Sequence, residues 1–248
     1  MIVLHQFARV WDIPNLSPFC SKVETYLRMA GLPYRVVSAV PPRAPRGKLP
    51  YITDEGRTLS DSRLIIDHLK EHHRAGLDAE LSPLQRAESR AFQRMIEEHL
   101  HWVVMWSRWI QPHNWAANKA AIFGRFAPVL CDAIARRQIR KEIWGQGLGR
   151  HSESEVFALG RQDLVALSDF LAGKPFFLGD RATTLDATAF GLLTNVIWCP
   201  VESPLKVDAL GHENLVAFCE RVRDRYYLEG GDGPARGSET HAAVRPGP

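Results

Sequence analysis

Two residues near the N-terminus, Ser17 and Cys20, have the spacing of a reactive pair. They stand at the ends of the box Ser17-Pro18-Phe19-Cys20, where irregular sequence gives way to an apolar helical pattern. Serine suits a helix N-cap and proline suits the first turn, so from spacing alone a helix cap is the simpler interpretation of Ser17. Cys20 could be a reactive thiol, but dithiol exchange cannot run with serine at the first position. We therefore expect Cys20 to be a small, semi-buried apolar residue.

Histidine and tryptophan positions further along the chain raise two more possibilities. His68 and His72 are four residues apart on a predicted helix, a spacing that can bind a metal ion. Because no third ligand accompanies them, we expect no metal. Trp102, Trp106 and Trp109 recur on one face of a later helix. Such a stripe is more often the core of a helical bundle than a binding pocket, and both interpretations stay open.

The elements that must position these residues form an α/β segment at the start of the chain. Hydrophobic periodicity predicts the order β-α-β-β-β-α within about 72 residues. The expected strands cover residues 2–7, 34–40, 51–53 and 57–59, and the expected helices begin at Ser17 and at Ser60. A Pro- and Gly-rich loop at 41–47 separates the second strand from the third.

The strand pattern disappears after residue 81, and the rest of the chain is predicted to be helical. Ser82-Pro83-Leu84-Gln85 is a capping box that starts a long helix towards residue 110. Further helices are expected at 127–144, 153–172, 184–198 and 213–227. We expect a first domain at 1–75, an all-helical domain at 82–228, and a flexible Gly- and Pro-rich tail at 229–248.

The composition excludes several classes of protein. The 248 residues are 45% hydrophobic and 24% charged, which is globular rather than disordered composition, and the formal net charge of +3 is no footprint for nucleic acid. No apolar run approaches the roughly 20 residues that span a membrane, and we expect no signal peptide. The four cysteines are far apart, which fits free thiols and a cytoplasmic protein.

Three parts of the chain carry recognisable motifs. They are residues 17–34, residues 47–52 with 59–62, and residues 147–152 with 178–180 and 183–188. Taken in order, they resemble the glutathione S-transferase superfamily and, within it, the branch of failed-axon-connections and metaxin-like proteins. The resemblance implies a thioredoxin-like N-terminal domain that binds glutathione, a helical C-terminal domain, and a homodimer.

The resemblance gives Ser17 a chemical role beside its capping role. In proteins with this fold, a residue at this place meets the sulfur of glutathione. Keeping a thiol ionised at neutral pH requires lowering its pKa by about 2 units, or about 2.7 kcal/mol. A hydroxyl that donates to the thiolate supplies about 1.5–3 kcal/mol, and the helix N-terminus adds about 0.3–1 kcal/mol. The two contributions together suffice.

The same resemblance assigns residues to the rest of the glutathione molecule. A cis Leu49-Pro50 bond would let Leu49 pair with the cysteinyl unit. Ser62 and the amides of its helix would hold the γ-glutamyl carboxylate, and Asp61 would meet the ammonium group. Lys48 is a candidate for the glycyl carboxylate. Asp61 and Ser62 could also serve as ordinary helix caps.

Two functions follow as expectations. The first is a transferase that conjugates glutathione, as its substrate, to a small hydrophobic electrophile in detoxification, with Trp102 and Trp106 as a possible acceptor pocket. The second is an adaptor that keeps the fold without turnover. It is suggested by a long segment at 8–16, which could cover the site or displace Ser17, and by a stretch at 40–48 too short for a full helix.

Overall fold

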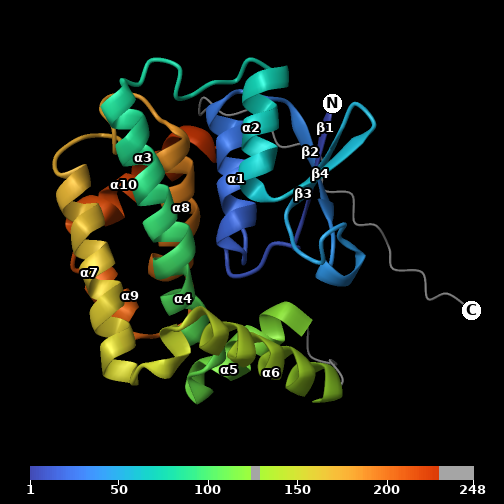
Figure 1. Ribbon diagram of the computed structural model, residues 1–248, viewed down its shortest axis with the longest axis vertical. Helices are drawn as coiled ribbons and strands as arrows, with labels where there is room; N and C mark the ends of the chain where they lie inside the picture. The colour runs from blue at the N-terminus through green and yellow to red at the C-terminus, as the bar shows by residue number, and fades with distance from the viewer. Residues whose placement is uncertain (124–128, 229–248) are drawn as a thin grey trace, which may run out of the picture.

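The computed structural model describes residues 1–123 and 129–228, and the side chains of these residues except 123 and 129–132. The predicted tail at 229–248 and the side chain of Cys131 therefore lie outside the described part. Figure 1 shows a sheet-containing half packed against a larger helical half. Within the described residues, no helix is both long enough and apolar enough to cross a bilayer.

The N-terminal half has the predicted β-α-β-β-β-α order. Its elements are β1 (Ile2–Gln6), α1 (Pro18–Met29), β2 (Tyr34–Ser38), β3 (Tyr51–Asp54), β4 (Arg57–Ser60) and α2 (Ser62–His72). The sheet order is β2-β1-β3-β4, with β1 parallel to β2 and antiparallel to β3. Helices α1 and α2 lie between the sheet and the helical half (Figure 1). This arrangement confirms the expected thioredoxin-like half.

The hairpin between β3 and β4 is set by its turn. Asp54 pairs with Arg57, which leaves Glu55 and Gly56 as a two-residue loop. Both loop residues have positive φ, 47° and 79°, as a type I′ turn requires. This turn fixes the register in which Tyr51 faces Ser60. The start of β3 and the end of β4 therefore meet at one end of the sheet.

The helical half differs from the prediction in its first element. The expected single helix at 82–110 is interrupted: α3 (Pro83–Met95) passes through a π-helical turn at Ile96–Leu100 into α4 (His101–Trp109). The remaining helices are α5 (Pro112–Phe123), α6 (Val129–Gln146), α7 (Glu153–Leu171), α8 (Thr184–Ile197), α9 (Pro204–Leu210) and α10 (Glu213–Tyr226). Two of these helices were not predicted: α5, which lacks a clear apolar stripe, and the seven-residue α9.

Helix α8 is the central element of the molecule, because all of its residues are buried. It packs against α1, so it joins the two halves. The approach is close enough to require glycine: a Cβ on Gly191 would lie 2.7 Å from the Pro18 carbonyl oxygen and 2.8 Å from the Lys22 nitrogen. A capping box starts this helix, with Asp186 Oδ2 accepting from the Thr183 backbone N–H at 2.7 Å.

Candidate functional site

Ser17 is the N-cap of α1. Its Oγ accepts from the Cys20 backbone N–H at 3.4 Å, and its own N–H donates to Asn15 Oδ1 at 3.1 Å. The Ser17 side chain is half-buried at the N-terminal end of α1. The capping interpretation of Ser17 is therefore observed directly, and the long capping distance still leaves the hydroxyl able to serve a second partner.

The segment at 8–16 keeps Ser17 in place. Asn15 is buried and donates to the Phe7 carbonyl at 2.8 Å, while its own carbonyl accepts from Ser21 Oγ and from Asn195 Nδ2 at 3.0–3.1 Å. Arg108 of α4 donates to the Leu16 carbonyl at 2.8 Å. The end of this segment is thus bound to α1, α4 and α8. These contacts hold Ser17 at the start of α1.

Cys20 lies in the core, as the sequence analysis expects. Its side chain is fully buried beside Leu49 and Ala44. Burial raises the pKa of the thiol to about 12, although the hydrogen bond with Ser17 acts in the opposite direction. A thiol with so high a pKa is not nucleophilic near neutral pH.

The hairpin register brings the other predicted residues to the same end of the sheet. The Leu49-Pro50 bond is cis, as predicted, and leads into β3. Because Tyr51 faces Ser60, Pro50 and Asp61 flank the same pair. Leu49 packs against Cys20 in the first turn of α1, near Ser17. Three segments that are distant in sequence therefore converge where α1, β3 and α2 begin.

Asp61 and Ser62 occupy the start of α2 in different ways. Asp61 is exposed and caps the helix, because its Oδ1 accepts from the N–H groups of Arg63 at 3.0 Å and Leu64 at 3.3 Å. Its φ of 83° is unusual for a residue other than glycine, and such strained positions cluster at ligand sites. Ser62 is buried at the first helical position. Lys48 is exposed.

A buried ion pair lies behind this site, and sequence analysis missed it. Lys22 of α1 donates to Glu97 in the π-helical turn at 2.5 Å, and both side chains are buried. Burial lowers the pKa of Lys22, while the negative charges of Glu97 and Asp61 act against that shift. No sequence signal links residues 75 positions apart.

His101 is a second residue that sequence analysis missed. The first residue of α4, it packs edge-on against Phe19 of α1 with ring centroids 4.8 Å apart. Its Nδ1 is buried without a hydrogen-bond partner among the described residues. Burial, together with the positive charges of Arg108 and Lys48, lowers the pKa of His101 to about 4. A neutral imidazole thus faces the sheet-containing half beside the predicted site.

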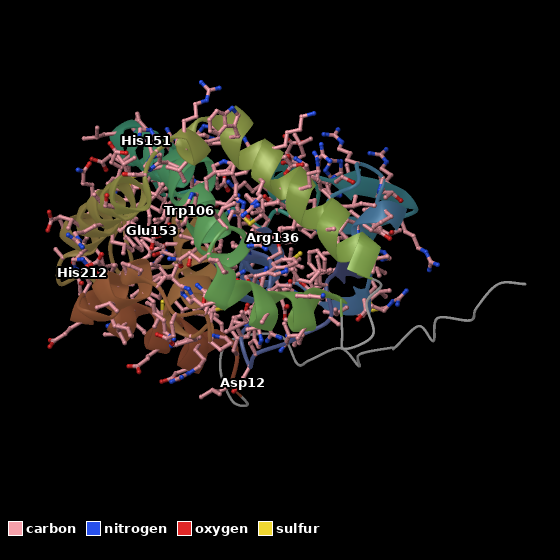
Figure 2. The ribbon with its side chains drawn as sticks, turned by 90° about the horizontal axis from the view of Figure 1, so that it is seen from below. Asp12, Trp106, Arg136, His151, Glu153 and His212 are labelled. Atoms are coloured by element: carbon pink, nitrogen blue, oxygen red, sulfur yellow. The ribbon has the colours of Figure 1, made fainter. Side chains whose placement is uncertain are left out.

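Trp102 and Trp106 of the tryptophan stripe both pack with the core of the helical half. Trp106 is buried and packs edge-on against Phe157 of α7 at 5.6 Å, inside the helical half (Figure 2). This contact favours the core interpretation for Trp106. Trp102 is half-buried, and its ring lies 5.6 Å from the ring of His101. Trp102 also packs against the helical core, and of the two predicted pocket residues it is the one in ring contact with His101.

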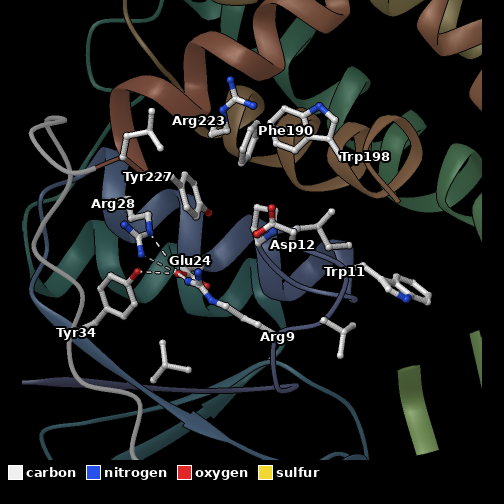
Figure 3. Close-up of a pocket in the computed structure, with 15 residues that line it drawn as sticks. Arg9, Trp11, Asp12, Glu24, Arg28, Tyr34, Phe190, Trp198, Arg223 and Tyr227 are labelled. Carbon is white, nitrogen blue, oxygen red and sulfur yellow. Dashed lines mark hydrogen bonds and ion pairs between the residues drawn. The ribbon is translucent and has the colours of Figure 1, made fainter. Parts of the chain in front are cut away.

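A cavity of about 750 Å³ lies on another face of α1 (Figure 3). At its edge the buried carboxylate of Glu24 accepts from Gln6 at 2.8 Å, from Tyr34 at 3.0 Å and from Arg28 at 3.1 Å, and it also pairs with Arg9. None of the predicted glutathione residues lines this cavity. The cluster ties α1 to β1, β2 and the segment that precedes α1.

Comparison with known protein families shows the family to which this chain belongs. The glutathione S-transferase N-terminal domain matches residues 18–114, and the glutathione S-transferase C-terminal domain matches residues 160–222. The chain belongs to the glutathione S-transferase family. Both the sheet-containing half and the helical half of the protein are therefore transferase-like.

The relatives of this chain include one protein that is named as a transferase and others that are not. It is 36% identical to the isoprene-epoxide–glutathione S-transferase of Rhodococcus sp. strain AD45, over 91% of this chain and 99% of that one. It is 34% identical to Failed axon connections of Drosophila melanogaster, over 92% of this chain but only 58% of the fly protein. It is 28% identical to mouse Metaxin-1, over 94% of this chain and 77% of the relative.

Solved structures support the transferase fold. A glutathione S-transferase from Methylobacterium radiotolerans, in complex with glutathione sulfonate, aligns with a TM-score of 0.58 and 18% identity, covering 97% of this chain and 98% of that one. At this identity the likeness shows the fold alone. The expected membership of the branch that contains failed-axon-connections and metaxin proteins is confirmed by the relatives.

Proposed function

We propose that this protein binds glutathione where α1, β3 and α2 begin and transfers its thiolate to a small electrophile. The observation that carries the proposal is the convergence of Ser17, the Leu49-Pro50 bond and Ser62 at one end of the sheet. The N-termini of α1 and α2 both lie there, and each favours an anion. Glutathione at neutral pH brings two carboxylates, and its thiol becomes a third anion where the site lowers the thiol pKa.

Each part of glutathione has a partner in this proposal. The backbone of Leu49 pairs with the cysteinyl unit, and Ser62 with the α2 amides holds the γ-glutamyl carboxylate. Asp61 meets the ammonium group, and exposed Lys48 meets the glycyl carboxylate. Ser17 is the catalytic residue, because its hydroxyl donates to the sulfur and favours the ionised form.

We propose that the electrophile is a small epoxide. The relative from Rhodococcus is named for its action on isoprene epoxide, and it aligns over nearly its whole length. In the reaction, the sulfur–carbon bond forms as the carbon–oxygen bond of the ring opens. The oxygen then takes a proton from water, which balances the proton that the thiol lost. The half-buried Trp102 and the ring of Phe19 supply apolar contacts for the hydrocarbon part.

His101 is placed to assist at the oxygen. Its low pKa keeps the imidazole neutral near pH 7, so one ring nitrogen carries a hydrogen and can donate to the developing alkoxide. Its buried, unpartnered Nδ1 marks it as a polar group that the described fold itself does not satisfy. A donor of this kind stabilises the transition state more than the ground state.

A second candidate function is a glutathione-transferase-fold adaptor without turnover. Metaxin-1 and Failed axon connections are relatives of this chain. In addition, only a 3₁₀ turn at Pro41–Arg43 stands between β2 and β3, which leaves that side of the site reduced. This function needs the fold and its surfaces but not an activated thiolate.

Glutathione-affinity chromatography followed by conjugation assays tests the proposal. We expect retention on the column, elution by free glutathione, and conjugation of both chlorodinitrobenzene and a small alkene epoxide. Ser62→Ala should weaken retention, whereas Ser154→Ala, in the exposed first turn of α7, should not. Retention without conjugation would favour the adaptor, and absence of retention would reject a glutathione site.

The proposal includes a cytoplasmic location and a homodimer. The described cysteines Cys20, Cys199 and Cys219 are all free and buried, which suits a reducing compartment. The dimer rests on family resemblance and pairs the sheet-containing half of one subunit with the helical half of the other. Light scattering at micromolar concentration should give about twice the 28.0 kDa chain mass.

A further inference from the structure

A cluster of metal-ligating side chains lies away from the proposed glutathione site. Asp54 is the last residue of β3, His68 is in the last turns of α2, and His73 directly follows α2. The Nε2 atoms of both histidines lie near the same oxygen, Asp54 Oδ2, at 3.0 Å from His68 and 2.6 Å from His73. The three potential ligand atoms all lie within 4.8 Å of one another.

We propose that Asp54, His68 and His73 form a zinc site. Two imidazole nitrogens and one carboxylate oxygen are ordinary zinc ligands, and a water molecule would complete a tetrahedral set. With bonds of about 2.0–2.2 Å, neighbouring ligands of a tetrahedral zinc ion are about 3.3–3.5 Å apart. The two separations from Asp54 Oδ2, 3.0 and 2.6 Å, are within 1 Å of that spacing, and all three ligand atoms lie within 4.8 Å of one another. Zinc would thus replace the protons that now bridge these groups after only small side-chain movements.

The environment of Asp54 supports a cation at this place. The side chain is only 2% exposed, and its second oxygen, Oδ1, has no hydrogen-bond partner in the part of the chain that the structure describes. A buried carboxylate oxygen without a partner is costly. A bound divalent ion compensates the carboxylate charge directly and can accept both oxygens as ligands.

The structure groups His68 with His73 and Asp54, not with His72 as the sequence spacing suggested. Residues 68 and 72 have the helical spacing, but the His72 ring stacks on His68 at 4.1 Å, and its Nδ1 lies 3.2 Å from the His68 carbonyl. His73 lies beyond the helix end, with φ of −106° and ψ of 4°, and this turn brings its ring to Asp54. The third ligand comes from a strand, so helix spacing cannot reveal it. The expectation of no metal is therefore revised by this proposal.

The position of the site indicates a structural role. Helix α2 has 11 residues, so its two ends are about 16 Å apart. Ser62 stands at one end, in the proposed glutathione site, and His73 follows the other. A metal ion held by Asp54 and His73 would join the sheet to the first residue of the connection between α2 and α3. This inference does not depend on glutathione binding.

Zinc binding to the untagged full chain tests the proposal. After treatment with a chelator, equilibrium dialysis against zinc chloride and elemental analysis should give one zinc ion per chain, with a raised Tm. Magnesium should bind far more weakly, because it prefers all-oxygen sites. Cobalt in place of zinc should give the visible absorption of a tetrahedral site.

Matched glutamine variants locate the site. His73→Gln removes a proposed ligand, whereas His72→Gln changes the exposed neighbour that stacks on His68. We expect His73→Gln and Asp54→Asn to weaken zinc binding more than about tenfold, since even outer-shell changes cost that much. His72→Gln should bind as the wild type does. His73 is partly exposed, so its variant should fold even if Asp54→Asn does not. Absence of zinc in the wild-type chain, or equal loss in His72→Gln and His73→Gln, would overturn the proposal.

Discussion

Lys22 Nζ and Glu97 Oε1 lie 2.5 Å apart and join the two halves of the protein through a buried ion pair. Lys22 belongs to α1, whose N-terminus carries Ser17, and Glu97 belongs to the π-helical turn that precedes His101. The pair therefore links the helix that presents Ser17 to the helix that presents His101. π-helical turns often occur at functional sites, and here the turn places a carboxylate against α1.

Removal of one partner from this pair should destabilise the protein strongly. We expect Glu97→Gln or Lys22→Met to lower the free energy of unfolding by about 3–5 kcal/mol, because the remaining charge stays buried without its nearest counter-charge. The double variant Lys22→Met with Glu97→Leu should lose less than the sum. Urea denaturation measures these values. Arg94→Gln, which removes a partly exposed partner of Glu97, is the control and should cost less than about 1 kcal/mol. Additive single and double losses would show that the pair is not coupled.

Ser17 variants should separate its capping role from its proposed catalytic role. Loss of the cap in Ser17→Ala should cost about 0.5–2 kcal/mol of stability, and Ser17→Asn should restore it. If Ser17 also donates to the thiolate, the pKa of bound glutathione should rise by about 1–2 units in Ser17→Ala. Turnover near pH 7 should then fall roughly ten- to a hundredfold and recover at higher pH. Ultraviolet absorbance of the bound thiolate against pH measures the shift, and coinciding titration curves would leave Ser17 as a cap only.

His101→Leu should affect epoxide and aryl substrates differently. The proposed hydrogen bond acts on an alkoxide, so epoxide conjugation should fall by roughly two- to tenfold, while conjugation of chlorodinitrobenzene should change less. Steady-state kcat/KM for both substrates gives the comparison. Equal losses for both electrophiles would assign His101 a packing role against Phe19.

His101→Leu should also change how the free energy of unfolding depends on pH. The folded-state pKa of His101 is about 4, below its ordinary value of 6.5, so the unfolded chain binds the proton more readily between these values. The wild-type protein should therefore lose stability as pH falls from about 6.5 towards 4, and His101→Leu should lose less. Denaturation at several pH values tests this, and parallel pH profiles would contradict it.

Asp78 should contribute stability that disappears in acid. Its carboxylate accepts from Lys70 at 2.7 Å and from the Thr184 N–H at 2.9 Å, so it fixes the connection between α2 and α3 to the start of α8. Burial alone would raise its pKa, but the hydrogen bonds from Lys70 and Thr184 outweigh burial and lower it. The contribution is therefore complete above the unfolded pKa of about 3.9 and is lost as pH falls through the lower folded value.

Asp78→Asn measures this contribution. Near pH 7 the variant should be less stable by about 1–3 kcal/mol, and the difference from wild type should shrink below about pH 4. Asp180→Asn changes an exposed aspartate and should stay within about 0.5 kcal/mol of wild type at both pH values. A difference that persists unchanged in acid would show that the charge of Asp78 is not the cause.

Local signals in the sequence predicted many of the elements and their ends, but not α5, α9 or the interruption between α3 and α4. The caps at Ser17, Asp61, Ser82 and Thr183, together with the Glu55-Gly56 turn, use interactions within a few residues of the chain. Side-chain periodicity likewise predicted most of the helices and the order of the N-terminal strands. The family resemblance then supplied the expected cis Leu49-Pro50 bond and the candidate glutathione residues.

Contacts between distant segments were decided only by the tertiary structure. Lys22 meets Glu97, His101 meets Phe19, and Asp54 meets His73 because helices and strands pack side by side, and periodicity along one element carries no information about its neighbour. The interruption of the predicted helix at 82–110 was likewise revealed only by the tertiary structure. The π-helical turn covers only Ile96–Leu100, within a longer helical pattern, and it places Glu97 against Lys22 of α1. The chain alone thus determined the side chains that cap many of the elements, because capping acts over a few residues, and packing determined which side chains share a site.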